Sequence, residues 1–446
     1  MPVSLDMTAE LVREAAWDLK ESEDRLDPLM EMIGDARFVL LGNSTHGTHE
    51  FYRDRSLISK KLIEEKDFSA IAAEADWPDA WRVNQYLLGE TDDVDAEASL
   101  NGFKRFPAWL WRNADILNFL GWLRDFNDKL PRSEKALIYG LDLYSLRNSI
   151  EAVLRYLREI DPEEAKRARS RYSCFEHYGA DPHAYAFQAT TSQSHSCEED
   201  VIRQLIELRR REEQYTQNRS ERDRDDYFSA EQNARLVKNA EHYYRAMFYG
   251  GASAWNIRGR HMMETFEAIV SHMDKRNFGT KVIIWAHNSI VGDARATEMK
   301  AKGEYNLGQL LREKFGSEVV SIGFTTCQGT VTAASEWDTP SERKRLDDAL
   351  PESYEALFHE CALETFFLNL RDNEHLRNYL ADPRLERSIG VIFTPSKDRM
   401  NYYGEARLSE QFDAILHFKE SRAVEPLERG GTGKNGEIPD TFPFAV

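Results

Sequence analysis

The chain has 446 residues, of which 41% are hydrophobic and 30% are charged, an ordinary balance for a globular protein with a sizeable core. Its formal net charge of −19 argues against a nucleic-acid-binding protein, which would carry a basic stripe. The first ten residues lack a basic segment followed by an apolar one, and no apolar run approaches 18 residues. We therefore expect a cytoplasmic protein with neither a nucleic-acid nor a membrane partner.

The first predicted elements are a buried strand at Phe38–Leu41 and a helix that follows a polar turn. Gly42 ends the apolar run, Thr48 is a suitable helix N-cap, and the helix is expected to end near Asp67. His46 would then lie at the carboxyl end of a strand, where ligands bind in open α/β sheets. The nearby helix N-terminus favours the neutral imidazole that a general base needs.

Further apolar runs without alternation indicate about seven strands in all. They lie at Ala70–Ala73, Ala136–Tyr139, Val282–Ala286, Val319–Ile322, Gly390–Phe393 and Ala414–Leu416. Helical stretches separate most of them, which predicts an α/β fold with a central, mostly parallel sheet flanked by helices.

A long helical pattern interrupts this alternation between residues 148 and 273, with a loop-rich break around Tyr178–Ser196. It is too long for an ordinary strand-to-strand crossover, so we interpret it as a helical insertion or subdomain within a single domain spanning 1–446. The glycine-rich segment 426–446 is expected to be an irregular C-terminal tail.

Titratable residues follow four of the predicted strands: His46, Glu74, Asp142 and His287. A histidine oriented by a carboxylate can activate water, and Glu74 is a candidate partner for His46 if its strand lies beside the first. Asp142 is expected to have a structural role in a turn. The sequence shows neither a G-x-S-x-G nucleophile elbow nor a glycine-rich phosphate loop.

Two other groups of residues have to be weighed. His46, His49, Glu74 and His287 are acceptable metal ligands, but the H-E-x-x-H signature is absent and no metal is expected. The four cysteines at 174, 197, 327 and 361 are scattered, which indicates neither a zinc site nor a disulfide framework.

An aromatic group beside two arginines lies after the second predicted strand. Either it lines an apolar pocket or it packs in the core. Its members are Phe103, Arg105, Phe106, Trp109, Trp111 and Arg112.

Several long stretches give the chain a resemblance to the erythromycin esterase family, whose members hydrolyse macrolide lactones. They are LLGNSTHGTHEFYRDR (40–55), IAAEADWPDAWRVNQYL (71–87), GFKRFPAWLWRN (102–113), YGLDLYSL (139–146), EQNARLVKNAEHYYRAM (231–247), WNIRGRHM (255–262) and WAHNSIVGDARATEM (285–299). The resemblance implies a deep cleft at the strand ends, an ester or lactone substrate, attack by water without a covalent intermediate, and no required cofactor.

The resemblance also implies roles for individual residues. The family's general-base histidine falls on His46 and its essential glutamate on Glu74, while Arg55 and His287 match cleft residues that hold or polarise the carbonyl oxygen. For substrate binding we expect Asn43, Trp109, Arg112 and Ile290.

The chain departs from the family pattern at three positions. Asn43 replaces a glutamate, Ile290 replaces the second histidine of H-N-x-H, and Gly259 replaces an aspartate. Neither Asn nor Ile can act as an acid or base. Two hypotheses follow: an esterase that uses His46-activated water, or a catalytically degenerate relative that keeps the cleft for binding small molecules.

Overall fold

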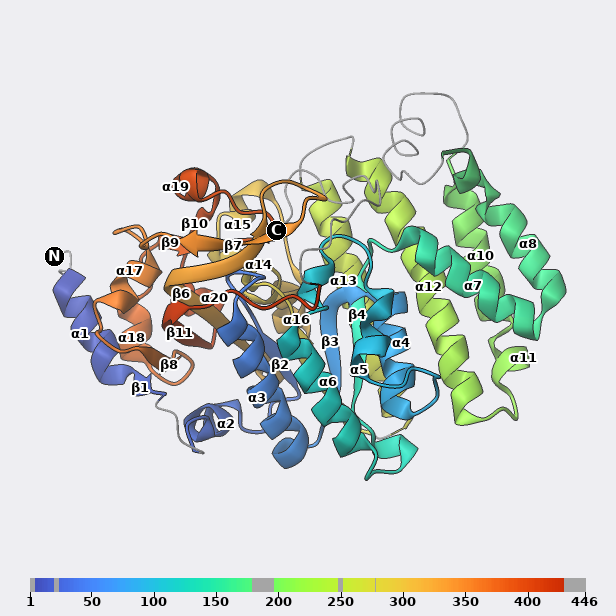
Figure 1. Ribbon diagram of the computed structural model, residues 1–446, viewed down its shortest axis with the longest axis horizontal. Coiled ribbons are helices and arrows are strands. Elements are labelled where there is room, and N and C mark those ends of the chain that lie inside the picture. The colour runs from blue at the N-terminus through green and yellow to red at the C-terminus, as the bar shows by residue number, and fades with distance from the viewer. Residues whose placement is uncertain (1–4, 20–23, 179–195, 248–251, 277, 429–446) are drawn as a thin grey trace.

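The fold is built around one nine-stranded sheet in a computed structural model that describes residues 5–19, 24–178, 196–247, 252–276 and 278–428 (Figure 1). Eight strands follow the spatial order β1 (Trp17–Asp18), β8 (Thr365–Asn369), β11 (Ala414–Ser421), β6 (Val319–Ala334), β2 (Phe38–Leu41), β5 (Lys281–Trp285), β3 (Phe68–Asp76) and β4 (Leu137–Asp142). β7 (Ser341–Leu346) pairs with β6, and β9 (Arg384–Arg387) forms a separate pair with β10 (Tyr403–Ala406).

The sequence prediction of a mostly parallel sheet flanked by helices is confirmed, because the six strands from β11 to β4 are mutually parallel. Six of the seven predicted strands correspond to these six. The prediction of a strand at Gly390–Phe393 is wrong. Ile392 within this range and Ile389 just before it form only isolated bridges. The sequence missed β1, β7 and β8, which pair antiparallel with their neighbours. β1 has two residues and β7 is strongly charged, whereas β8 (TFFLN) is an apolar run that the prediction overlooked.

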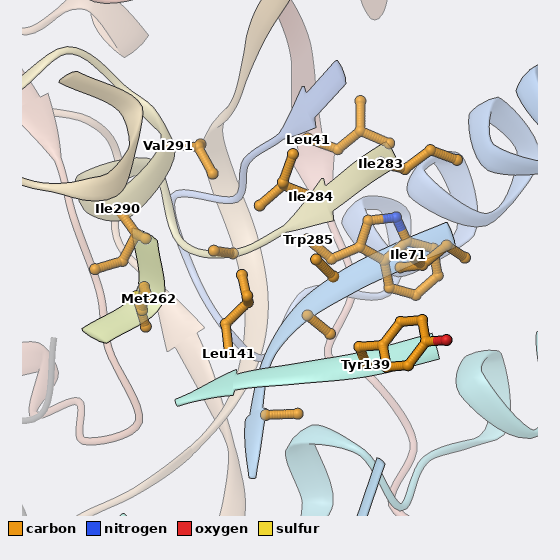
Figure 2. Close-up of a cluster of buried hydrophobic side chains, with 14 of the residues drawn as sticks. Leu41, Ile71, Tyr139, Leu141, Met262, Ile283, Ile284, Trp285, Ile290 and Val291 are labelled. Atoms are coloured by element: carbon orange, nitrogen blue, oxygen red, sulfur yellow. The ribbon is translucent and has the colours of Figure 1, made fainter. Parts of the chain in front are cut away.

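Helices cover both faces of the sheet. On one face α3 (His49–Lys66) and α6 (Ala114–Asn127) pack against β5, where Trp285 Nε1 donates to Ser59 Oγ at 3.0 Å. On the other face α13 (Ser253–Asp274) and α16 (Leu307–Phe315) enclose Phe38, whose ring centroid lies 5.1 Å from that of Phe266. Figure 2 shows the apolar cluster at the centre of these layers. Burial on both faces explains why these strands are continuous apolar runs.

The described part of the chain between β4 and β5 is mostly helical, and this is the segment interpreted above as an insertion. It contains α7 (Leu146–Ile160), α8 (Pro162–Tyr172), α10 (Glu198–Arg210), α11 (Glu212–Thr216), α12 (Glu221–Met247) and α13. Its status as a subdomain of a single domain stays a prediction. Most of the expected break at 178–196 and residues 429–446 of the expected tail lie outside the described residues.

A disulfide joins Cys174 to Cys197, with Cα atoms 5.8 Å apart. The expectation that the cysteines form no disulfide is therefore wrong for this pair. The two residues are 23 positions apart and are brought together by the packing of α8 against α10, a contact that cysteine spacing does not reveal.

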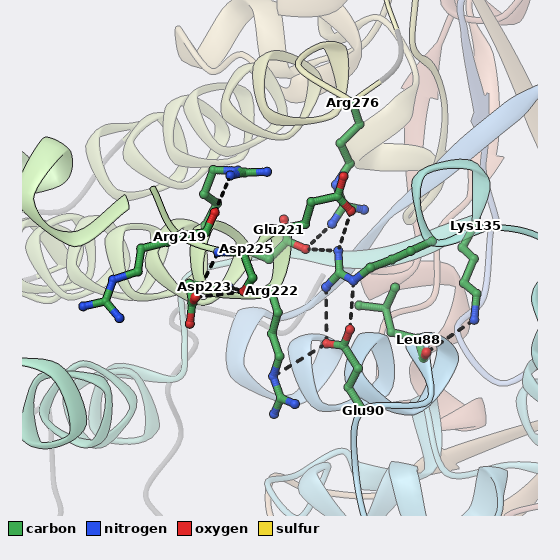
Figure 3. A network of polar contacts seen from close by, with 12 residues as sticks. Leu88, Glu90, Lys135, Arg219, Glu221, Arg222, Asp223, Asp225 and Arg276 are labelled. Carbon is green, nitrogen blue, oxygen red and sulfur yellow. Dashed lines mark hydrogen bonds and ion pairs between the residues drawn. The ribbon is translucent and has the colours of Figure 1, made fainter. Parts of the chain in front are cut away.

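An ion network centred on Asp225 attaches the helical segment to the sheet domain (Figure 3). Asp225 accepts from Arg132 Nη1 at 2.6 Å, lies 2.8 Å from His272 Nε2 and also pairs with Arg276. Arg132 in turn donates to Glu90 Oε1 at 2.8 Å. The network thus connects α12, α13 and the loops that follow α4 (Trp77–Leu88) and α6.

The remaining α-helices are short or peripheral. They are α1 (Leu5–Ala15), α2 (Asp27–Ile33), α5 (Ala96–Ser99), α14 (Asn288–Val291), α15 (Met299–Lys302), α17 (Tyr354–His359), α18 (Glu374–Tyr379), α19 (Asp398–Asn401) and α20 (Leu408–Gln411).

Gly47 offers a direct test of this packing. A Cβ at Gly47 would lie 1.8 Å from the Thr332 carbonyl oxygen, so Gly47→Ala must displace β6 or the turn. We expect it to lower the free energy of unfolding by at least about 1–3 kcal/mol. Gly121→Ala is the matched control, because a Cβ there meets no atom within 4 Å and alanine favours α6 by about 1 kcal/mol. Urea unfolding of both variants measures the difference, and equal stability would contradict the described approach of β6 to the turn.

Candidate active site

The candidate site lies where β2, β5 and β3 end side by side. β5 pairs with both neighbours, since Trp285 is in register with Leu41 of β2 and with Ala73 of β3. The condition set for a His46–Glu74 pair, that β3 lies beside β2, is therefore not met. His287 comes from the intervening strand, and its ring centroid lies 4.8 Å from that of His46.

Glu74 is held by two donors that do not include His46. Its Oε1 accepts from Arg258 Nη2 at 2.7 Å, and its Oε2 accepts from the backbone N–H of His287 at 2.8 Å. The carboxylate therefore fixes the turn after β5 and orients the guanidinium of α13. Glu74 acts on the site by holding these two groups in place.

Arg258 is a buried cation between two carboxylates. Besides Glu74 it binds Asp142, with Nε donating to Oδ1 at 3.0 Å and Nη2 to Oδ2 at 2.7 Å. Burial lowers the pKa of Arg258, but the charge of Asp142 is the largest of the effects that hold it well above its ordinary value. Asp142 also accepts from the Leu143 N–H at 2.9 Å, so it has the turn role expected from the sequence together with an ion pair that the sequence did not reveal.

His46 borders a cavity at the strand ends and is 6% exposed. Burial is the largest cause that lowers the pKa of His46 well below 6.5; His287 and the cations Arg55 and Arg258 lower it further, and Asp142 opposes this as the smallest effect. The imidazole is therefore neutral at neutral pH. Its ring is accessible from the cavity.

His287 is fully buried beneath His46. Its Nδ1 accepts from the Ser289 backbone N–H at 3.2 Å and lies 2.9 Å from Ser289 Oγ, so the neutral ring carries its proton on Nε2. Burial lowers the pKa of His287 to about 4, with the charge of Glu74 opposing this shift. His287 is a neutral neighbour of His46 and does not itself line the cavity.

Arg55 and Asn43 lie together behind the two histidines, both 2% exposed. The guanidinium of Arg55 stacks over Tyr52 at 4.8 Å and over Trp285 at 5.3 Å, and burial lowers its pKa. The Asn43 amide forms hydrogen bonds with its neighbours in the orientation in which its oxygen accepts from Arg55 Nη1 at 3.1 Å. The four predicted catalytic residues are thus neighbours, but only His46 and Glu74 line the cavity.

The residues predicted to bind substrate lie outside the cavity wall. Ile290 points into the apolar cluster next to Met262 (Figure 2). Trp109 is buried in the core, and Arg112 pairs with Glu428 and donates to Asn101 Oδ1 at 2.9 Å. Other members of the same aromatic segment, Phe103, Phe106 and Trp111, do line the cavity.

The cavity has a volume of about 90 Å³ and combines an apolar wall with a strongly polar floor. Arg105 donates to Asp76 Oδ2 at 2.8 Å, and burial, followed by the charge of Asp76, raises the pKa of Asp79 to about 7. The lining residues that sequence reasoning did not consider for a site include Asp76, Asp79, Tyr144, Arg258, Trp337 and Val391, whereas Arg105 was named beside the aromatic group. Arg105 and Arg258 lie within the resembling stretches, but no strand-end position marked them.

Comparison with known proteins shows the family of the chain. The sequence matches the erythromycin esterase family over residues 63–421, so the chain belongs to that family. It is 22% identical to the erythromycin esterase type II of Escherichia coli over 424 residues, covering 91% of this chain and 94% of that protein. It is 20% identical over 409 residues to the putative hydrolase YbfO of Bacillus subtilis (strain 168), covering 87% of this chain and 84% of that protein.

Two solved structures share the fold. A succinoglycan biosynthesis protein aligns with a TM-score of 0.74 at 20% identity, covering 94% of this chain and 98% of that one. A mutant of the erythromycin esterase EreC in its open conformation aligns with a TM-score of 0.64 at 18% identity, covering 94% of this chain and 97% of that one. Membership of the family supports a hydrolase. None of the described helices is long and apolar enough to cross a membrane.

Arg258 can be tested through the charges it compensates. Arg258→Met leaves Glu74 and Asp142 buried without their cation, and we expect the free energy of unfolding at pH 7 to fall by about 3–5 kcal/mol. The control is Arg260→Met on the same helix, because Arg260 is exposed and, among the residues that the structure describes, donates to Tyr305 Oη at 3.1 Å. That change should stay within about 0.5 kcal/mol. Equal effects in urea unfolding would refute a compensating role for Arg258.

Proposed function

We propose that this protein hydrolyses a carboxylic ester or lactone, with His46 as the general base. The observation that carries the proposal is a neutral imidazole at the wall of a cavity, beside a fixed buried cation. A neutral imidazole can accept a proton from water as the water attacks a carbonyl carbon. A bound ester would meet His46 and Arg258 on the same wall.

The proposed reaction needs only water, the ester and His46 as the group that accepts and returns the proton. The water oxygen bonds to the carbonyl carbon, its proton passes to His46, and the carbonyl oxygen becomes an oxyanion. Collapse of this intermediate breaks the bond to the ester oxygen, which takes a proton from the imidazolium. The products are a carboxylic acid and an alcohol, or a single hydroxy acid when the substrate is a lactone.

Arg258 and Arg105 are the cations that reach the cavity, and we assign to them the stabilisation of the oxyanion. The sequence expectation gave this role to His287 and Arg55. Neither residue lines the cavity, so we do not assign this role to them. Glu74 binds both Arg258 and the His287 backbone N–H, and we assign to it the positioning of these two groups.

Substitution of the base separates this mechanism from a nonspecific effect. His46→Ala should reduce kcat/KM for a hydrolysed ester or lactone by about 10²–10⁴-fold, because the proton acceptor is lost. His49→Ala is the control on the same turn: His49 is partly exposed, lies 2.8 Å from Asp115 Oδ2 and does not line the cavity. It should retain most of the parent activity. Full activity in His46→Ala would remove His46 from the mechanism.

The pH dependence follows from the pKa of His46. The base is active when neutral, and its pKa in the folded protein is lowered well below 6.5, so kcat/KM should persist below pH 6.5 and fall only as pH drops through that lowered pKa. Asp79 titrates near pH 7 in the same cavity, so the profile should be measured in the parent and in Asp79→Asn. If kcat/KM falls at or above pH 6.5 on the acid side of the profile, and still does so in Asp79→Asn, the lowered pKa of His46 is contradicted.

The alternative is a family member that binds small molecules without hydrolysing them. It is favoured by Asn43, whose amide faces Arg55 where the family pattern has a carboxylate, and by Ile290, which lies in the apolar cluster. Incubation of the parent with a panel of lactones and simple esters, with calorimetry beside product analysis, distinguishes the two. Binding without product in the parent, together with turnover in Asn43→Glu, would establish the alternative.

A further inference from the structure

A second and larger cavity, with a volume of about 820 Å³, lies between α4, α7 and the first half of α12. The segment from Gly102 to Arg105 separates it from the catalytic cavity. Gly102 and Lys104 border the large cavity, whereas Phe103 and Arg105 border the catalytic one, and Asp79 lines both. No residue assigned to ester hydrolysis above lines the large cavity.

The lining of the large cavity is unusually polar for a ligand site. Most small-molecule pockets are lined by apolar side chains with a few polar groups, whereas this one is dominated by carboxylates, amides and guanidinium groups. Asn233 is 2% exposed, and its Nδ2 donates to the Ser229 carbonyl at 2.8 Å. Its Oδ1 has no hydrogen-bond partner among the described residues. Such walls suit a ligand that forms hydrogen bonds over most of its surface.

The charges of the wall argue against an anionic ligand. Its seven acidic residues, Asp79, Asp92, Asp93, Glu151, Glu159, Asp223 and Asp226, outnumber its five basic residues, Arg82, Lys104, Arg155, Arg219 and Arg222. Arg82 is already bound by Asp93, with donor–acceptor distances of 2.6 and 3.0 Å. A phosphate would therefore enter a field of the wrong sign.

Three aromatic rings belong to the lining, those of Trp81, Tyr156 and Tyr215. Trp81 is partly buried and stacks on Trp77 with an interplanar angle of 8°, which fixes the orientation of its ring. Tyr156 contributes a half-buried ring from α7. Rigid aromatic rings among planar amides and carboxylates can accept the C–H face of a sugar ring while the polar groups bind its hydroxyls.

We propose that the large cavity binds a sugar or another neutral polyhydroxylated ligand. Each hydroxyl both donates and accepts, so it can bind carboxylates, amide groups and guanidinium groups on the same wall. The site is independent of ester hydrolysis. Its ligand would share only Asp79 with the catalytic cavity.

The test measures binding by saturation-transfer NMR with the full chain. The probes are methyl α-D-glucopyranoside, N-acetylglucosamine and maltotriose, with inorganic phosphate as the anionic comparison. Asn148→Ala/Arg155→Ala removes two exposed polar side chains that line the cavity from α7. Arg147→Ala/Arg158→Ala is the matched control, because both residues are exposed on α7 and neither lines a cavity described here.

We expect saturation transfer to at least one sugar, at least a fivefold loss of affinity in Asn148→Ala/Arg155→Ala, and parent-like affinity in the control. His46→Ala should bind the sugar as the parent does, whether or not the protein hydrolyses esters. Three results would each overturn the proposal: no transfer to any sugar, equal affinity in the two double variants, or loss of binding in His46→Ala. Binding of phosphate in place of sugars would likewise refute the neutral ligand class.

Discussion

The candidate site depends on one interaction, the ion pairing of Arg258 with Glu74 and Asp142. Two carboxylates at the ends of neighbouring strands would repel each other if buried alone, and either would be protonated or drawn toward water. Arg258 removes this cost by binding Glu74 and Asp142 together, at 2.7 Å from each. Glu74 is then able to accept from the backbone N–H of His287. One guanidinium on α13 thus determines the geometry of three strand ends.

The sheet order explains which parts of this site the sequence could predict. Continuous apolar runs identified the six parallel strands and therefore placed His46, Glu74 and His287 at one edge. They could not show that β5, some 200 residues further along the chain, lies between β2 and β3. That order is set by long-range pairing, and it places His287, in place of Glu74, beside His46. Arg258 was overlooked because it lies within helix α13 and not at a strand end.

The aromatic segment after α5 illustrates a different limit. Its composition correctly indicated both possibilities, an apolar pocket and core packing, and the structure uses both. Trp109 and Trp111 are two residues apart around a single turn of 3₁₀-helix, so they face different surroundings: Trp109 is buried in the core and Trp111 reaches the cavity. In a turn this short, no periodic pattern reveals which ring faces inward. Ile290 is similar, since its four-residue helix directs it into the apolar cluster.

The replacement of the family's glutamate by Asn43 also bears on the electrostatics of His46. No carboxylate among the described residues bonds to the imidazole, and Glu74 and Asp142 are bound by Arg258. Its positive neighbours Arg55 and Arg258 therefore favour the neutral form before substrate binds. An oxyanion that develops beside Arg258 during ester hydrolysis would supply the missing negative charge at the moment His46 becomes positive. In the proposed mechanism the carboxylate absent at Asn43 would not be required, since the oxyanion itself would stabilise the imidazolium.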